Sequence, residues 1–156
     1  MNEIWIDLPW ERLRLTMPDT RLTEQLAYVI AKANKRLEDE LEERLRPSGV
    51  PIEQLRILEV LQNSDGSSMG DLAQRALIEP TTLTKIVDRM VSDALVYRAP
   101  DPDDRRRVLI RMAPGGKTLF KRLDRITTLQ QDRLQKQIPP AKMDELRQLL
   151  TEIMEF

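Results

Sequence analysis

One stretch near the middle of the chain restricts its fold more than any other, because an amphipathic helix there runs directly into a β-hairpin. The helix is predicted to extend from Pro80 to Leu95, since proline suits the first helical position, where an N–H would have no partner. Its apolar residues recur three and four positions apart and form one stripe that has to face a core. The stripe consists of Leu83, Ile86, Val87, Met90, Val91, Ala94 and Leu95.

The opposite face of this helix carries hydroxyl and basic side chains. Among them are Thr81, Thr82, Thr84, Lys85 and Arg89. Short hydroxyl groups in the first turn, followed by cations one and two turns later, could approach base edges and phosphates from a helix lying in the major groove of DNA. A charged helix face is more often simply solvated, so the helix alone leaves both interpretations open.

A shorter helix is predicted just before it. Ser68, followed three residues later by Asp71, matches the capping-box pattern of a helix start, and the helix should end near Leu77. Two helices joined by three or four residues, the second with a polar face, form the layout of a helix-turn-helix, whose second helix enters the major groove. Without the hairpin, an arbitrary pair of helices in a bundle would explain the pattern equally well.

The hairpin favours the helix-turn-helix. Residues 96–99 read as one strand and 100–104 as the turn, and the inward residues of the returning strand are expected to be Val108, Ile110 and Met112. The prolines at 100 and 102 should keep the tip from pairing further.

Three consecutive arginines, Arg105, Arg106 and Arg107, follow the turn. At the end of a two-stranded ribbon, arginines can enter a minor groove or contact flanking phosphates. They could also pair with the nearby carboxylates of Asp101, Asp103 and Asp104. We expect both, with the carboxylates orienting the arginines.

The string from Asp71 to Lys117, DLAQRALIEPTTLTKIVDRMVSDALVYRAPDPDDRRRVLIRMAPGGK, resembles the winged helix-turn-helix core of the MarR family of bacterial transcriptional regulators. The most specific part is the hairpin, or wing, where residues 104–106 fit the family's Asp-x-Arg pattern and residues 112–116 stand where Leu-Thr-x-x-Gly is usual. The likeness extends from about residue 21 to the end. Two residues depart from the pattern: Ala113 replaces the usual threonine, which removes a helix cap, and Glu79 replaces a shorter capping side chain.

The resemblance implies a mainly α protein with a small β-hairpin wing. A winged helix-turn-helix domain at about 51–113 would be flanked by dimerisation helices at about 21–46 and 115–156, all within one domain at 21–156. The chain would be a homodimeric regulator, more often a repressor in this family, that binds a pseudo-palindromic operator in double-stranded DNA. The residues expected to contact the DNA are Ser68, Thr81, Thr82, Thr84, Lys85, Arg89, Arg105, Arg106 and Arg107, with Arg106 in the minor groove.

Helical stripes outside the central region also favour a dimer. One stripe runs through residues 22–45 until Pro47, Ser48 and Gly49 break it, a second helix starts near Pro51, and two more follow Pro114 and Pro139. The terminal stripes contain more apolar positions than a small monomer could cover, which favours a twofold interface. A monomeric bundle that hides the same stripes internally is the alternative.

Composition agrees with a single domain and a polarised charge. The chain has 156 residues and a net charge of −1, but residues 81–117 contain eight Lys or Arg against five Asp or Glu, whereas residues 1–50 contain eight against ten. This polarity matters more for a nucleic-acid partner than the net charge does.

Residues 1–20 contain both tryptophans, in IWIDLPW, and are interpreted as an ordered arm that packs on a partner subunit or covers a ligand site. The apolar run is too short for a signal peptide, and no segment approaches the length of a membrane span. We therefore expect a cytoplasmic protein without a membrane partner.

The chain contains no cysteine and no histidine, which excludes thiol oxidation and a histidine-based metal sensor, and makes catalysis, a metal or a cofactor improbable. By analogy with the family, an effector would lie beside Tyr28, Lys32 and Phe120, two aromatic rings and a cation that suit a small aromatic acid or its thioester. Core packing and a solvated lysine explain the three residues equally well. A helical adaptor that binds an acidic protein surface is the alternative to a DNA-binding regulator.

Overall fold

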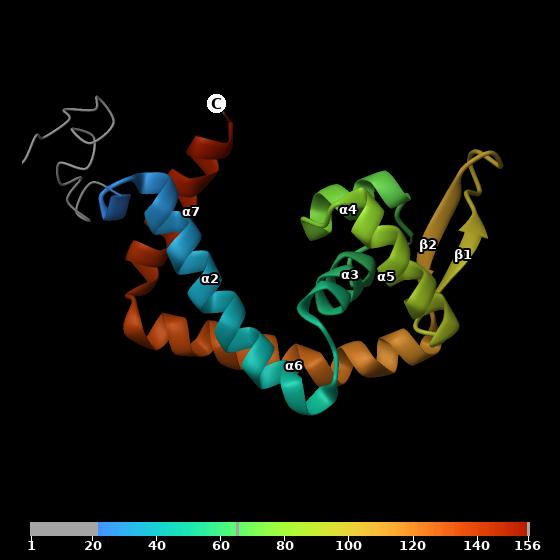
Figure 1. The fold of residues 1–156 in the computed structure, drawn as a ribbon, viewed down its shortest axis with the longest axis horizontal. Coiled ribbons are helices and arrows are strands. Elements are labelled where there is room, and N and C mark those ends of the chain that lie inside the picture. Colours follow the sequence, from blue (N-terminus) through green and yellow to red (C-terminus); the bar gives the residue numbers. More distant parts are fainter. Residues whose placement is uncertain (1–21, 65, 156) are drawn as a thin grey trace, which may run out of the picture. The chain divides into compact units, whose positions relative to one another are not determined.

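The computed structural model describes residues 22–64 and 66–155, which fall into two compact units, Met1–Glu40 and Leu41–Phe156. Helix α2 (Leu26–Leu45) has residues in both units and is followed by the short 3-10 helix η2 (Arg46–Ser48) (Figure 1). In the first unit, α2 exposes large apolar side chains, including Leu26, Val29 and Leu37. The expected arm at residues 1–20 lies outside the described residues.

The second unit is built around helix α3 (Ile52–Gln62), which is buried along most of its length. It contacts helices α4, α5 and α6 and strand β2, because its apolar residues point to several sides rather than to one. Ile52, Leu55, Leu58 and Leu61 are all buried. The core cluster around it also includes Leu72, Leu83, Val87, Met90, Ile110 and Leu123.

Helices α4 (Met69–Ala76) and α5 (Pro80–Ser92) pack against each other and against α3, which confirms the predicted helix-turn-helix (Figure 1). Helix α4 ends where Leu77 adopts a left-handed backbone with φ of 56°, and the N–H of Ile78 donates to the carbonyl of Ala73. The predicted end of α5 at Leu95 is wrong by one turn. The helix stops at Ser92 because Ala94 turns left-handed, with φ of 53°, and the Leu95 N–H donates back to Met90.

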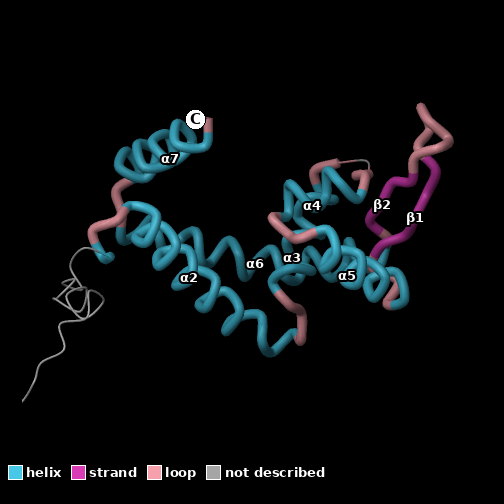
Figure 2. The backbone as a smooth tube through the Cα atoms, turned by 45° about the horizontal axis from the view of Figure 1, so that its top comes forward, coloured by secondary structure: helices cyan, strands magenta, loops and turns pink. Residues whose placement is uncertain are grey.

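Strands β1 (Val96–Pro100) and β2 (Val108–Met112) form the antiparallel hairpin, with Val96 opposite Met112 and Pro100 opposite Val108. Ile110 and Met112 are buried as expected, but Val108 is 51% exposed, so its predicted inward orientation is wrong. Val108 lies at the end of the strand next to the turn, where the hairpin projects past helices α4 and α5 (Figure 2). The alternation of the strand therefore continues beyond the core that could bury it.

Helix α6 (Pro114–Gln137) begins against the turn that follows α5. The Ala113 N–H donates to the Leu95 carbonyl oxygen at 3.0 Å, and a Cβ added at Gly116 would lie 2.1 Å from the same oxygen. Only glycine allows this approach, which explains why the sequence requires it at that position of the hairpin motif. Consistent with the predicted loss of a cap, the Ala113 side chain provides no hydrogen bond to the helix start.

The last helix is α7 (Pro140–Met154). Its one buried side chain among the described residues is Met143. Leu146, Leu149 and Ile153 follow one another along one face and are 45%, 51% and 42% exposed. Within residues 22–64 and 66–155, no helix has the length and apolar character that crossing a membrane requires.

Replacing Gly116 with alanine should destabilise the fold by about 1 to 3 kcal/mol, because the added methyl group collides with the Leu95 carbonyl rather than with a movable side chain. Chemical denaturation measures the change. Gly70 is the matched control: it lies in α4 with its nearest neighbour at 3.9 Å, so Gly70→Ala should leave stability unchanged or raise it by up to about 1 kcal/mol. Equal effects at the two glycines would contradict the close contact.

Candidate nucleic-acid interface

The polar residues that were predicted for the exposed face of α5 all lie on it. Leu83, Val87 and Met90 are fully buried, which turns the opposite face outward. That face exposes Thr81, Thr82, Thr84, Lys85 and Arg89. The helix has no side-chain cap at Glu79, so its first turn keeps backbone N–H groups available to an external acceptor.

Some groups on this face already have internal partners. The Thr84 hydroxyl donates to the Pro80 carbonyl at 3.0 Å, and Arg89 lies 3.8 Å from Asp93. Within the described part of the chain, Thr81, Thr82 and Lys85 have no such side-chain partner. The first turn of α5 therefore offers two free hydroxyl groups and a free ammonium group.

Ser68 serves as the N-cap of α4. Its hydroxyl oxygen accepts the Asp71 backbone N–H at 3.1 Å, and the hydroxyl donates to the Asp71 carboxylate at 2.6 Å. The predicted helix start is thus confirmed. These two hydrogen bonds engage the serine that the sequence also suggested as a contact to a ligand.

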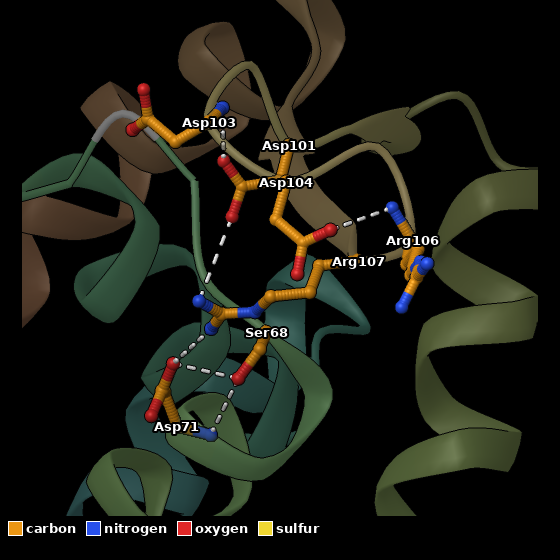
Figure 3. A network of polar contacts seen from close by, with 7 residues as sticks. All are labelled: Ser68, Asp71, Asp101, Asp103, Asp104, Arg106 and Arg107. Atoms are coloured by element: carbon orange, nitrogen blue, oxygen red, sulfur yellow. Dashed lines mark hydrogen bonds and ion pairs between the residues drawn. The ribbon is translucent and has the colours of Figure 1, made fainter.

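The guanidinium group of Arg107 lies between two carboxylates that belong to different elements (Figure 3). One is Asp71 in the first turn of α4, at 3.9 Å, and the other is Asp101 at the start of the hairpin turn, at 3.7 Å. Asp101 is largely buried, and its carboxylate also accepts the Asp103 N–H at 3.0 Å. Arg107 therefore connects the hairpin to the helix-turn-helix.

The other two arginines of the turn are arranged differently. The Arg106 backbone N–H donates to the Asp104 carboxylate at 3.0 Å, while the Arg106 side chain points away from the network around Arg107 (Figure 3). Arg105 and Arg106 are exposed, and neither guanidinium forms an ion pair with another described residue. Carboxylates therefore hold the side chain of Arg107, as expected, whereas the Asp104 carboxylate contacts only the backbone of Arg106.

A second ion pair, missed by the sequence analysis, holds the hairpin to α5. Arg98 of β1 donates from its guanidinium to the carboxylate of Asp88. The two residues are ten positions apart, with no helical or strand spacing that would have paired them in advance. Together with Arg107, this contact fixes both helices of the helix-turn-helix to the hairpin.

The three expected effector residues fall in both units and are described separately. In the first unit, the Lys32 ammonium lies 5.9 Å from the centre of the Tyr28 ring, and both residues line a cavity of about 350 Å³ on α2. In the second unit, Phe120 of α6 is partly buried against the core cluster.

Acidic groups elsewhere do not form a metal site within residues 22–64 and 66–155. Burial raises the pKa of the Glu59 carboxyl in α3, Asp124 raises it further, and Arg56 opposes both effects. Glu59 lies on α3 and takes no part in the α5 face or the hairpin turn.

Comparison with known proteins places this geometry among transcriptional regulators. The model of the MarR family matches residues 48–107. The homoprotocatechuate degradative operon repressor of Escherichia coli is 32% identical over 102 residues, which cover 65% of this chain and 69% of the relative.

Two solved structures share the fold. The transcriptional repressor CouR bound to a 23-mer DNA duplex has a TM-score of 0.77 at 21% identity, covering 89% of this chain and 99% of CouR. Bordetella bronchiseptica BpsR, described for regulation of its DNA binding by 6-hydroxynicotinic acid, has a TM-score of 0.76 at 21% identity and covers 86% of this chain and 96% of BpsR.

Replacing Ser68 with alanine should lower the free energy of unfolding by about 1 kcal/mol, because the first turn of α4 loses its capping acceptor. Ser68→Gly should cost only a few tenths of a kcal/mol, since glycine leaves the N-terminal N–H groups open to water. Denaturant titration of the two variants gives the comparison. If Ser68→Ala is as stable as the unchanged chain, the hydroxyl is not the cap.

Proposed function

This chain belongs to the MarR family of DNA-binding transcriptional regulators, which are not enzymes, and we propose that it represses transcription as a homodimer whose paired α5 helices and hairpins grip a pseudo-palindromic operator. The observation that carries the proposal is that the arginines of the hairpin turn have different contacts. Arg107 is held by internal carboxylates, whereas Arg105 and Arg106 stay exposed at the turn.

Helix α5 is proposed to lie in the major groove. Thr81, Thr82 and Lys85 form its free polar edge, and hydroxyl and ammonium groups can donate to base acceptors and to phosphates. Thr84 and Arg89 lie on the same face and are proposed to contact the backbone after giving up their weak internal partners. An exposed ion pair such as Arg89–Asp93 is worth only about 0–1 kcal/mol, so a phosphate can replace the carboxylate.

The hairpin is proposed to place Arg106 in the neighbouring minor groove, with Arg105 on a flanking phosphate. The sequence predicted that Arg107 and Ser68 also contact the DNA. The internal contacts favour a positioning role for these two residues, because Ser68 caps the start of α4 and Arg107 joins the hairpin to α4.

Exposed apolar stripes support the homodimer. In α7 the stripe is formed by Leu146, Leu149 and Ile153, and in the first unit α2 exposes a stripe of its own. Contiguous apolar side chains of this size favour a partner surface over water. A twofold axis would present two α5 helices to half-sites separated by about one turn of DNA, roughly 34 to 36 Å.

A small aromatic acid is proposed as the effector. BpsR, which shares the fold, is described for regulation by 6-hydroxynicotinic acid. In the first unit of this chain, Tyr28 and Lys32 offer a ring and a cation side by side on α2. To release DNA, the effector has to bind the DNA-incompetent arrangement of the dimer more tightly than the competent one.

The alternative of a protein-binding adaptor is not supported, since relatives of this chain are named as repressors. The DNA-binding proposal is tested with fragments from the neighbourhood of the chain's own gene. Preference for one of these fragments over random sequence supports it, and the lack of any preference at low salt contradicts it.

Replacing Arg106 with alanine should lower the slope of log affinity against log salt concentration by about one unit, because one phosphate or groove contact no longer releases a counterion. Equilibrium titration at several salt concentrations measures this slope. Arg107→Ala should weaken binding with little change in slope if Arg107 positions the hairpin.

The matched control is Arg147→Ala, which removes the same charge from α7, where Arg147 pairs with Asp144 at 2.9 Å. Its slope should equal that of the unchanged chain. Equal slope changes for Arg106→Ala and Arg147→Ala would indicate an effect of net charge and would argue against a specific contact.

Replacing Leu149 with glutamate should shift the homodimer to monomer, because each subunit would then bury a charge in the apolar interface. Sedimentation velocity over a range of concentrations measures the shift. The control is Thr151→Glu, two residues further along α7 and therefore on the other side of the helix. A dimer that tolerates both substitutions equally excludes the α7 stripe from the interface.

A further inference from the structure

A cavity of about 280 Å³ lies at the base of the hairpin, at the end of the strands that is remote from the turn. The end of α3, both strands and the start of α6 all contribute to its wall, and all belong to the second unit. The side chains that matter for the argument are Leu61, Tyr97, Arg111, Met112, Lys117 and Lys121.

The wall of this cavity concentrates positive charge. Arg111 comes from β2, and Lys117 and Lys121 come from the first two turns of α6. No acidic residue lines the cavity, and no ion pair to another described residue involves any of the three cations. Lysines four positions apart share one helix face and repel each other, so the arrangement is unfavourable until an anion joins it.

The remainder of the wall is suited to an apolar group. Tyr97 lies directly opposite Arg111 in the hairpin and is 44% exposed, so its ring is accessible beside the guanidinium. Leu61 and Met112 are buried side chains that close the inner side. The volume of about 280 Å³ lies just below the range of about 300 to 1,000 Å³ that is usual for ligand pockets, so the cavity fits a single ring rather than a nucleotide.

From these features we propose that the cavity is a ligand site for a small aromatic acid with two negative charges. Its acidic groups meet Arg111 and the two lysines, and its ring packs between Tyr97 and the Leu61–Met112 wall. None of Tyr28, Lys32 and Phe120 lines this cavity, so the site is separate from the effector site proposed above. Because the ligand would contact both strands and α6, it would bind to the elements that support the hairpin.

Binding to the free protein tests the proposal. The probe is phthalate, an aromatic dicarboxylate, titrated calorimetrically into the full-length chain at fixed ionic strength, with benzoate as the singly charged comparison. We expect phthalate to bind more tightly than benzoate. In the double variant Lys117→Gln, Lys121→Gln, the phthalate dissociation constant should rise at least tenfold, since two charge-assisted contacts are lost.

The matched control is Lys136→Gln, an exposed lysine further along the same helix, which should leave phthalate affinity unchanged. Backbone amide resonances of Tyr97 and Arg111 should shift on addition of phthalate in the unchanged chain and in the control. Absence of binding, or equal binding by the double variant and the control, would overturn the proposal.

DNA phosphates are the other source of negative charge for this cluster. If the double variant, without phthalate, loses affinity for a random duplex and its salt slope falls by about two units, the lysines contact DNA and the ligand site is refuted. This outcome differs from a failure of the proposed function. A chain that prefers no operator but still binds phthalate through Lys117 and Lys121 retains the cavity as a ligand site and loses its role as a repressor.

Discussion

The position of the hairpin relative to α5 depends on one backbone carbonyl group, that of Leu95. It receives the Ala113 N–H and lies against Gly116, so the turn after α5, the start of β1 and the first turn of α6 meet at one point. The ion pairs Asp88–Arg98 and Asp71–Arg107 then act on a hairpin that is already in place. Because exposed ion pairs contribute only about 0–1 kcal/mol each, packing at Leu95 sets the position, and the charges select the orientation.

The sequence was sufficient to predict the helices and the hairpin and most of the faces that they bury. Periodicity located α5 and the hairpin because each has one dominant contact surface, and the family resemblance supplied the order of the elements. Two local errors have physical causes. The apolar stripe of α5 continues through a turn, since Leu95 packs against the core although Ala94 has left the helix. The alternation of β2 extends to Val108, although this end of the strand lies beyond the core that could bury its side chain.

The sequence predicted which residues belong to the candidate site, but it did not predict which of them are paired with other residues of the chain. The three consecutive arginines 105–107 are the same residue type. Only the folded positions of Asp71 and Asp101 distinguish Arg107 from the other two. The ion pair between Arg98 and Asp88 could not be predicted, because a separation of ten residues matches neither a helical nor a strand repeat. The cavity beneath the hairpin was likewise invisible, because its cations come from a strand and a helix whose neighbouring positions depend on the packed fold.

The attachment of the hairpin to both helices has a consequence for how a double helix would be recognised. If α5 and the hairpin keep a constant angle, α5 in the major groove and the hairpin in the adjacent minor groove would fit only one separation of the two grooves. Duplexes would then be sorted by the width and twist of the intervening backbone, including base pairs that no side chain reaches. A narrow, A·T-rich minor groove facing the hairpin turn would suit this fixed arrangement, whereas a flexible hairpin would accept a narrow or a wide minor groove.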